Sequence, residues 1–173
     1  MIFTSESGLI EPSRAVEWDD WYRGHLEAMV AVPGITSAQR LTAVGDGAPP
    51  SLAIYTVASP AVFDSEIYLS TRGMGPWQPL IDRRHYRRNL FDGLDIAPEI
   101  APDDNLLVAD RTSPEPAGQG LIWLRAAGLD RSTLFRGVAV LPGAAAARRL
   151  AVLLSGPVAF YRPVTARLGG RLA

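Results

Sequence analysis

The chain has 173 residues, of which 47% are hydrophobic and 20% are charged, and its formal net charge is −1. This length suits one ordinary domain or two small ones, and the composition excludes a disordered or collagen-like chain. Without cysteine the chain has no disulfide framework or thiol nucleophile, which fits a reducing compartment. The first residues do not read as a signal peptide, and no apolar stretch approaches the roughly 20 residues of a membrane span. We therefore expect a soluble, cytoplasmic protein with no membrane contact.

The charge is divided unevenly along the chain. Residues 1–110 hold 8 Arg and 16 acidic residues, a balance of −8, whereas residues 111–173 hold 9 Arg and 2 acidic residues, a balance of +7. Opposite fields on one chain favour docking of the two halves on each other, or on the opposite half of another copy. A nucleic-acid partner is not expected.

The first half reads as alternating strands and helices. Residues 1–5 predict a short strand, and Pro12-Ser13 opens a helix with Ser13 as its N-cap. Pro33-Gly34 ends this helix, and residues 35–44 and 51–57 predict two strands, the second apolar on both faces. The sheet should therefore be covered on both sides. Residues recurring at helical spacing mark the buried face of the helix: Ala15, Trp18, Tyr22, His25, Leu26 and Met29.

The rest of this half completes a βαββαβ order. Ser59-Pro60 starts a helix that runs to about residue 69, and residues 77–90 predict a second, more charged helical segment. Residues 105–111 predict the last strand. The order is that of a ferredoxin-like unit, so the expected fold class is α+β.

An internal similarity predicts a second, truncated ferredoxin-like unit. Residues 32–41 align without gaps on residues 141–150, and Pro, Gly, Ala, Arg and Leu are identical in the two stretches. Further along, residues 52–55 correspond to residues 158–161. Chance matching in an Ala- and Arg-rich chain is the alternative. The expected organisation is a first unit over 1–111, a linker over 112–119 and a degenerate second unit over 120–173. The elements expected in the second unit are a strand at 120–125, a helix at 129–140 and a hairpin of 146–154 with 157–164.

One stretch of the first helix resembles a known family. Residues 18–26 read Trp-Asp-Asp-Trp-Tyr-Arg-Gly-His-Leu, and Val32-Pro33-Gly34 and Ala38-Gln39-Arg40-Leu41 follow. This pattern resembles the EthD-like members of the dimeric α+β barrel superfamily, as do Pro76-Trp77 and residues 87–90. Gly24 and Glu27 depart from it, because the family often has Glu and Pro at these positions.

The resemblance implies a fold and a pocket. Two ferredoxin-like units would pack their sheets face to face as a barrel, across a homodimer or within one chain as an internal pseudo-dimer. The matching histidine in the family faces the pocket, so His25 becomes the candidate catalytic base and Tyr22, one turn earlier, its assistant. A core histidine satisfied by a backbone carbonyl is the alternative interpretation, and core packing is the alternative for the aromatic residues.

Four further residues are candidates for substrate contact. Trp18 and Trp21 would form walls of the pocket, and Trp77, behind the loop 73–76, would cap it. Arg40 would hold a carboxylate or enolate oxygen, with a surface salt bridge as the alternative. Desolvation should lower the pKa of His25 and leave it neutral near pH 7.

No metal or cofactor is expected from the sequence. His25 and His85 are sixty residues apart without metal-ligand spacing, and the basic run 83–88 reads as a solvated helix face. Haem occurs elsewhere in the superfamily that the chain resembles, so both histidines remain candidate axial ligands. The hypothesis is a small-molecule-binding barrel that performs cofactor-independent proton transfer or oxygenation on a small aromatic, polyketide-like or lactone metabolite. The alternative is a non-catalytic scaffold or assembly protein with a filled cleft.

Overall fold

A computed structural model describes residues 1–115, 120–143 and 154–169. Within these ranges eight strands form one closed barrel in the order β1-β3-β2-β8-β5-β7-β6-β4, and every neighbouring pair is antiparallel. The expectation of an α+β barrel is confirmed, and a single chain closes it. The strands are β1 (Ile2–Ser7), β2 (Ile35–Ala43), β3 (Ser51–Val57), β4 (Arg87–Asp92), β5 (Asp104–Arg111), β6 (Ile122–Leu129), β7 (Phe135–Pro142) and β8 (Ala159–Pro163).

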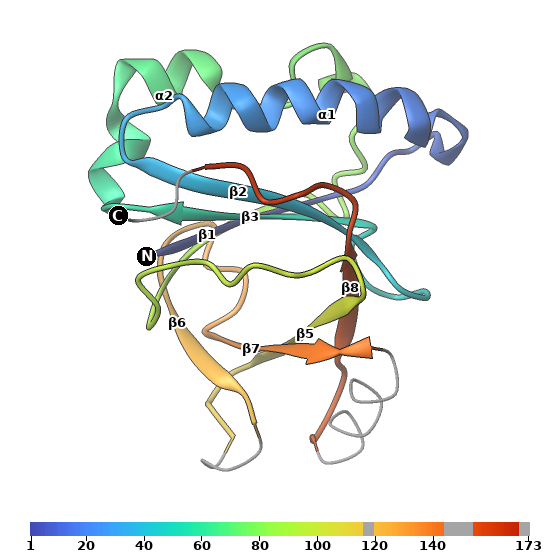
Figure 1. Cartoon of the computed structure of the whole chain (residues 1–173), viewed down its shortest axis with the longest axis vertical. Coiled ribbons are helices and arrows are strands. Elements are labelled where there is room, and N and C mark those ends of the chain that lie inside the picture. Colours follow the sequence, from blue (N-terminus) through green and yellow to red (C-terminus); the bar gives the residue numbers. More distant parts are fainter. Residues whose placement is uncertain (116–119, 144–153, 170–173) are drawn as a thin grey trace.

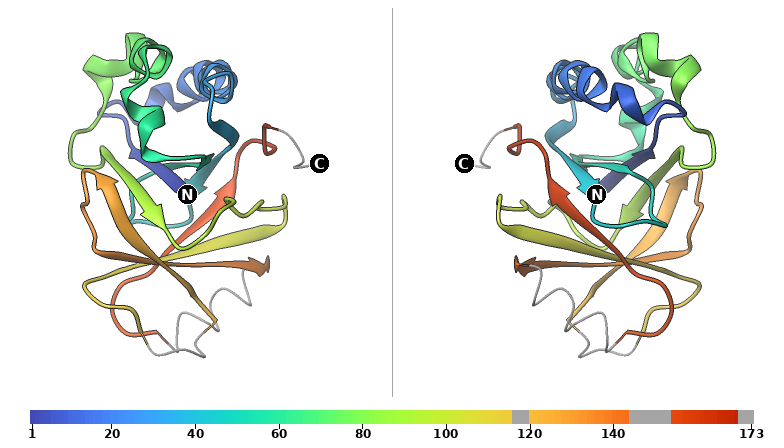
Figure 2. Two further views of the ribbon diagram at one scale, coloured as in Figure 1. Left: turned by 90° about the vertical axis from the view of Figure 1, so that its left-hand side faces the viewer. Right: turned by 90° about the vertical axis from the view of Figure 1, so that its right-hand side faces the viewer.

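Helices cover one side of this barrel. The long helix is α1 (Ala15–Val30), preceded by a 3-10 turn at Pro12–Arg14, and the short helix is α2 (Glu66–Thr71), flanked by 3-10 turns at Pro60–Asp64 and Gly75–Leu80. Figure 1 shows α1 and α2 lying over the face formed by β1, β3 and β2. In the two views of Figure 2 the same helices stay together on that side, and the C-terminal strands cross below.

Two hydrophobic cores result from the alternation of strand residues. On β1, Phe3 packs toward the helices, whereas Ile2 packs inside the barrel with residues of the C-terminal strands. On β3, Tyr55 likewise packs toward the helices and Ile54 packs inside the barrel. The expected sheet with two covered faces is therefore confirmed.

The connection after α1 depends on a glycine. Gly34 has φ +90, and a Cβ built on it would lie 2.5 Å from Cγ2 of Val62. A side chain here would be both strained and crowded. The Pro33-Gly34 break therefore ends the helix as predicted and allows β2 to start at Ile35.

The helix starts differ from the prediction. Arg14 rather than Ser13 occupies the N-cap of α1, and no side chain caps this helix because the Pro12–Arg14 turn runs directly into it. The expected helix at 59–69 is divided into a 3-10 turn and α2. Ser65 separates the two and accepts a hydrogen bond from the Tyr68 backbone amide at 3.2 Å.

Two predicted helices are wrong. The segment 77–90 forms the end of a 3-10 turn, a turn and then β4, and 129–140 contains the end of β6, a turn and most of β7. Val138 faces the barrel interior and Gly137 the opposite side, where Leu121 and Trp123 lie against it. Short apolar runs have too few residues to separate the helical period from strand alternation.

Strand β5 also pairs differently from the prediction. Its range matches the expected strand 105–111, yet it lies between β7 and β8 instead of closing the first βαββαβ unit. The place next to β1 belongs to β4, which the sequence reading had taken as helical. The strand predicted at 157–164 is present as β8, but it pairs with β2 and β5; its expected partner 146–154 lies almost wholly outside the described residues.

The aligned repeat does not occupy matching positions. Gly34 lies between α1 and β2, whereas Pro142 is the last residue of β7 and Gly143 follows it. The second block is also displaced, because 52–55 lies on β3 and 158–161 enters β8, the fourth strand of the C-terminal half. The two Pro-Gly pairs therefore occupy different positions in the fold, while residues 144–150 of the second copy lie outside the described residues. The strand order, however, runs β4-β1-β3-β2 and then β8-β5-β7-β6, which is the same order in each half.

Opposite charges meet inside the barrel, as the uneven charge distribution predicted. Arg136 on β7 is 1% exposed, and its Nη2 donates to Oε1 of Glu6 at 2.6 Å and to Oδ2 of Asp110 at 2.7 Å. Its Nε bonds Oδ1 of Asp110 at 2.7 Å, and Nη1 bonds the Thr4 hydroxyl at 3.2 Å. An acidic residue of β1 and a basic residue of β7 thus form a buried ion pair between the two halves.

Across the described ranges, no helix has both the length and the apolar character needed to cross a bilayer.

Candidate ligand site beneath helix α1

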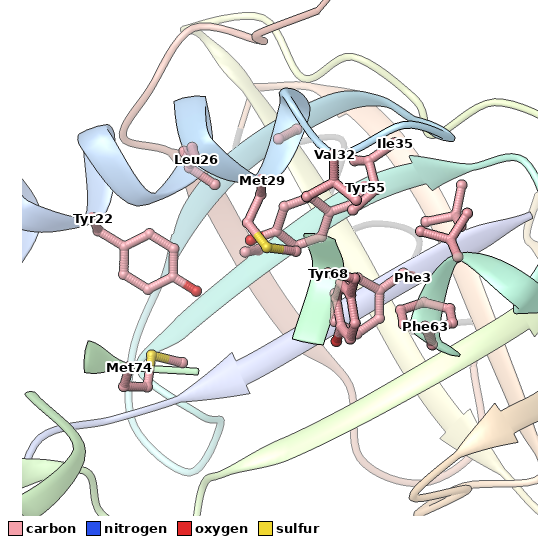
Figure 3. Packing of buried hydrophobic residues seen from close by; sticks show 14 of the residues in the cluster. Phe3, Tyr22, Leu26, Met29, Val32, Ile35, Tyr55, Phe63, Tyr68 and Met74 are labelled. Carbon is pink, nitrogen blue, oxygen red and sulfur yellow. The ribbon is translucent and has the colours of Figure 1, made fainter. Parts of the chain in front are cut away.

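The inner face of α1 carries the predicted aromatic residues. Trp18, Tyr22, Leu26 and Met29 are buried at three- and four-residue spacing, so each points from the helix onto the sheet. Figure 3 shows Tyr22, Leu26 and Met29 extending from α1 toward the core that contains Tyr55. The amphipathic pattern of the sequence places these four correctly, whereas Ala15, which was expected on the same face, is exposed and His25 is half-buried.

His25 is half-buried against its neighbours on the same helix. Its ring stacks on Trp21 with centroids 4.9 Å apart and planes 10° apart, and the Tyr22 ring meets it edge-on at 5.6 Å. Burial lowers the pKa of the His25 imidazole from 6.5 to about 4. The imidazole is thus neutral near pH 7 and able to accept a proton, as predicted.

A small cavity opens beside His25. Its volume is about 20 Å³, which is room for about one water molecule. Helix α1, strands β1 and β3, and the segments around α2 and the start of β4 all contribute to it. The lining residues are Phe3, Ser5, His25, Met29, Tyr55, Tyr68, Arg72, Gly73, Met74, Tyr86 and Arg88.

Two buried polar atoms near this cavity have no hydrogen-bond partner among the described residues. One is the Tyr22 hydroxyl and the other is Nε of Arg88, which lines the cavity. Burial raises the pKa of Tyr22, while the Arg40 charge opposes this shift, so the phenol keeps its proton. The site therefore offers donors from Tyr22 and Arg88 and an acceptor from neutral His25.

Arg40 lies under α1 but does not line the cavity. Its guanidinium carbon is 4.5 Å from the Trp18 ring centroid and 4.4 Å from that of Tyr22. Nη1 donates to Oδ1 of Asp19 at 2.6 Å and Nε donates to the Ser51 hydroxyl at 3.0 Å. Arg40 therefore ties α1 to β2 and β3 and fixes the Tyr22 ring from one face.

The three tryptophans predicted to contact substrate do not line the cavity. Trp18 is 3% exposed and meets Tyr22 edge-on at 5.5 Å. Trp21 reaches toward the loop after α2, where a Cβ on Gly75 would lie 3.3 Å from its Cζ2. Trp77 is 6% exposed, and the Arg14 guanidinium carbon lies 4.7 Å from its ring centroid.

The sequence did not reveal most of the cavity lining. Tyr68, Met74, Tyr86 and Arg88 come from segments that were read as surface helix or loop. Tyr55 carried a usable signal, because it alternates with Ile54 on a strand that was recognised as covered on both faces. The contributions of α2 and of the start of β4 depend on long-range packing that no local pattern contains.

A haem does not fit beside His25. A cavity of about 20 Å³ is far smaller than a tetrapyrrole, and Trp21 covers one face of the imidazole. Within the described residues no group of three His, Cys, Asp or Glu side chains is placed to hold a metal ion.

The fold defines the class of the protein as an α+β barrel, with a small cavity between helix and sheet. No family model and no curated protein matches the chain. Among solved structures it is similar to a chlorite dismutase-like protein, with a TM-score of 0.60 and 13% identity over 95% of each chain.

Two further solved structures are similar over nearly the whole chain. An anthrone oxidase-like protein has a TM-score of 0.57 at 13% identity, covering 97% of this chain and 92% of its own. A monooxygenase-like protein from Fusobacterium nucleatum subsp. nucleatum has a TM-score of 0.55 at 11% identity, covering 98% and 95%. At these identities the likeness shows the shared barrel fold.

Proposed function

We propose that the chain binds a small molecule beneath α1 and acts on it by cofactor-independent proton transfer or oxygenation. The observation that carries the proposal is the desolvated imidazole of His25, which faces a cavity shared with four further elements. Such an imidazole is unprotonated near pH 7, because its pKa is about 4, and it is free to accept a proton or a hydrogen bond, although a pKa this low makes it a weak base. A small aromatic, polyketide-like or lactone metabolite suits the aromatic lining.

In this proposal His25 accepts the substrate proton and the Tyr22 phenol donates a hydrogen bond to the developing oxyanion. Once the cavity expands to admit the substrate, Trp18 and Trp21 form its walls and Trp77 caps it. Arg40 holds an anionic substrate oxygen; because Asp19 already occupies its Nη1, the substrate anion displaces Asp19 from the guanidinium.

A substrate larger than water requires the cavity to expand. Met74 and Met29 line it, and methionine side chains rearrange easily because they are unbranched. Met74 lies between Gly73 at φ +99 and Gly75 at φ +47. Figure 3 places Met74 below Tyr22, at the side of the cluster away from α1. Movement of this Met74 segment opens the site.

The shared strand order supports a finer statement about the fold. We infer that β1–β4 and β5–β8 are two ferredoxin-like units within one chain, an internal pseudo-dimer, because both halves follow the same order around the barrel. The acidic and basic balance of the two halves agrees with this pairing. Homodimer formation is a separate proposal, which analytical ultracentrifugation tests.

A thermal-shift screen with small aromatic, polyketide-like and lactone compounds tests the proposed function. We expect compounds that stabilise the wild type to stabilise Met74→Ala more, because the shorter side chain enlarges the cavity. In a turnover assay with such a compound, His25→Gln should lose well over tenfold in rate while His85→Gln retains it. An unchanged rate in His25→Gln removes the catalytic role.

The small cavity also favours a second candidate function. A volume of about 20 Å³ agrees with a non-catalytic scaffold whose cleft is filled by side chains. If no compound stabilises either the wild type or Met74→Ala, the scaffold interpretation replaces the enzyme.

A further inference from the structure

An open cavity of about 660 Å³ lies at one end of the barrel, and this volume is within the range of sites for organic ligands. The start of β4, the end of β5, the connection between β6 and β7 and the segment before β8 surround it. A smaller cavity of about 370 Å³ beside Glu6 adjoins it, because the two share Arg87, Asp110 and Pro157.

Two arginines of the lining have no ionic partner. Arg87 and Arg131 are exposed, and within the described ranges neither guanidinium takes part in a salt bridge. The remaining stretches of the sequence, 116–119, 144–153 and 170–173, contain no Asp or Glu. No acidic side chain is therefore left to pair with these two arginines, and their charges are open to a ligand.

The other charged residues of the lining are already engaged. Both carboxylate oxygens of Asp110 accept hydrogen bonds from Arg136. Arg111 donates to Oε1 of Glu115 at 2.8 Å, and its remaining nitrogens donate to three backbone carbonyls. Since Arg136 also bonds Glu6, three carboxylates meet these two guanidiniums and the two unpaired ones. The region therefore keeps an excess of one positive charge.

Strand β4 brings the two unpaired arginines close together. Asp130 donates its backbone N–H to the carbonyl of Arg88 at 2.8 Å, and its Oδ2 accepts the Arg88 N–H at 2.7 Å. Arg131 follows Asp130 and Arg87 precedes Arg88, so each is one residue away from this bonded pair. The Asp130 carboxylate lies 3.9 Å from Nη2 of Arg88 and balances that charge. Arg87 and Arg131 therefore repel each other, and an anion bound to both removes the repulsion.

The connection that carries Arg131 is held in place by hydrogen bonds. Arg131 has φ +47, in the left-handed region that residues other than glycine rarely adopt. The next residue, Ser132, donates its N–H to Oδ1 of Asn89 at 2.8 Å and accepts a bond from Nδ2 of Asn89 at 2.8 Å. Asn89 is fully buried on β4. A backbone held in an unfavourable conformation is characteristic of binding sites. The position of Arg131 is thus fixed before a ligand arrives.

The lining also offers apolar surface. Leu134 belongs to it and is 52% exposed, and Pro157 adds a second apolar side chain. A simple inorganic anion would leave this surface in contact with water, whereas an anion with an organic body would cover it.

We propose that this cavity binds a small organic phosphate, with its phosphoryl oxygens accepting hydrogen bonds from Arg87 and Arg131 and its organic body on Leu134. Guanidinium groups bond phosphate oxygens in pairs, and a phosphate monoester offers two guanidiniums more acceptor oxygens than a carboxylate does. The site is independent of the function proposed above, because it shares no lining residue with the cavity beside His25.

Isothermal titration calorimetry tests the proposal with phenyl phosphate, benzoate, benzyl alcohol and inorganic phosphate. We expect saturable binding of phenyl phosphate that weakens as sodium chloride is added. Benzoate and inorganic phosphate should each bind about tenfold more weakly or worse, and benzyl alcohol should show no binding. Equal or tighter binding of any of these three overturns the proposal, as does phenyl phosphate that shows no saturable binding.

Charge-matched variants locate the bound phosphate. Arg87→Gln and Arg131→Asn should each lower the affinity for phenyl phosphate about tenfold or more, and asparagine tolerates the left-handed backbone at position 131. Arg125→Gln removes the same charge from an exposed position of β6 outside the lining, so affinity should stay within about twofold. His25→Gln should also leave it unchanged. Equal losses in Arg125→Gln and the two lining variants would show a general charge effect and contradict the site, as would binding that survives both lining variants.

Discussion

Two cavities of this barrel differ in the physics that shapes them. The cavity beside His25 lies between helix and sheet, is nearly filled by aromatic and methionine side chains, and holds a neutral imidazole. The cavity beside Glu6 lies at a barrel end, is far larger, and borders a buried ion cluster. The contrast shows that one fold can place a desolvated imidazole and a buried ion cluster at separate positions. Each can be disturbed without the other.

The largest expected effect is at the ion cluster. Arg136→Met removes the only guanidinium bonded to Glu6 and Asp110 among the described residues and leaves two carboxylates uncompensated. We expect the free energy of unfolding to fall by about 3–5 kcal/mol. Urea denaturation at neutral pH measures it, with the exposed Arg125→Met on β6 as the matched control that should stay within about 0.5 kcal/mol. Equal stability of the two variants would show that the cluster does not hold the halves together.

A pH-dependent change in stability should come from the cavity beside His25. The pKa of His25 is about 4 in the folded chain, against an ordinary value of 6.5 for an imidazole in water, so the unfolded chain binds more protons between these values. Stability should therefore fall as the pH drops from about 6.5 to 4, by up to about 3 kcal/mol from this residue. Denaturation curves across this range measure it. His25→Gln should lose this component of the slope and His85→Gln should keep it; identical slopes in both variants would contradict the assignment.

The smallest expected effects compare two hydroxyl groups in the helical layer, those of Tyr22 and Ser65. Tyr22→Phe removes a buried hydroxyl that has no partner in the described structure, so stability should be unchanged or higher by up to about 1 kcal/mol. Ser65→Ala removes the helix cap that bonds the Tyr68 amide and should cost about 1 kcal/mol. A loss of more than about 1 kcal/mol in Tyr22→Phe would mean that its hydroxyl is satisfied in solution.

The sequence predicted those parts of the fold that have strong local signals. Helix α1 has a clear apolar stripe and a Pro-Gly end, and β2 and β3 have strand composition with a turn between them, so all three lie where expected. The segments 77–90 and 129–140 failed, because β4 and β7 gain their stability from pairing with β1, β6 and β5. Pairing between distant strands leaves little trace in a single short segment.

The candidate sites show the same difference between local signals and long-range contacts. The set of Trp18, Trp21, Tyr22 and His25 shares one helix, so helical spacing was enough to bring its members together. The meeting of Glu6 with Arg136 joins residues 130 positions apart, and charge balance alone predicted only that the halves attract. The cavity at the barrel end had no sequence signal, because it forms only when the barrel closes.

The most direct test of the account is an NMR titration of the His25 imidazole in the folded protein, with its resonance assigned by loss in His25→Gln. The account predicts that this imidazole stays neutral down to low pH and titrates with a midpoint near 4. A midpoint at or above 6.5 would show that the ring is exposed to water and would contradict the desolvated base beneath α1.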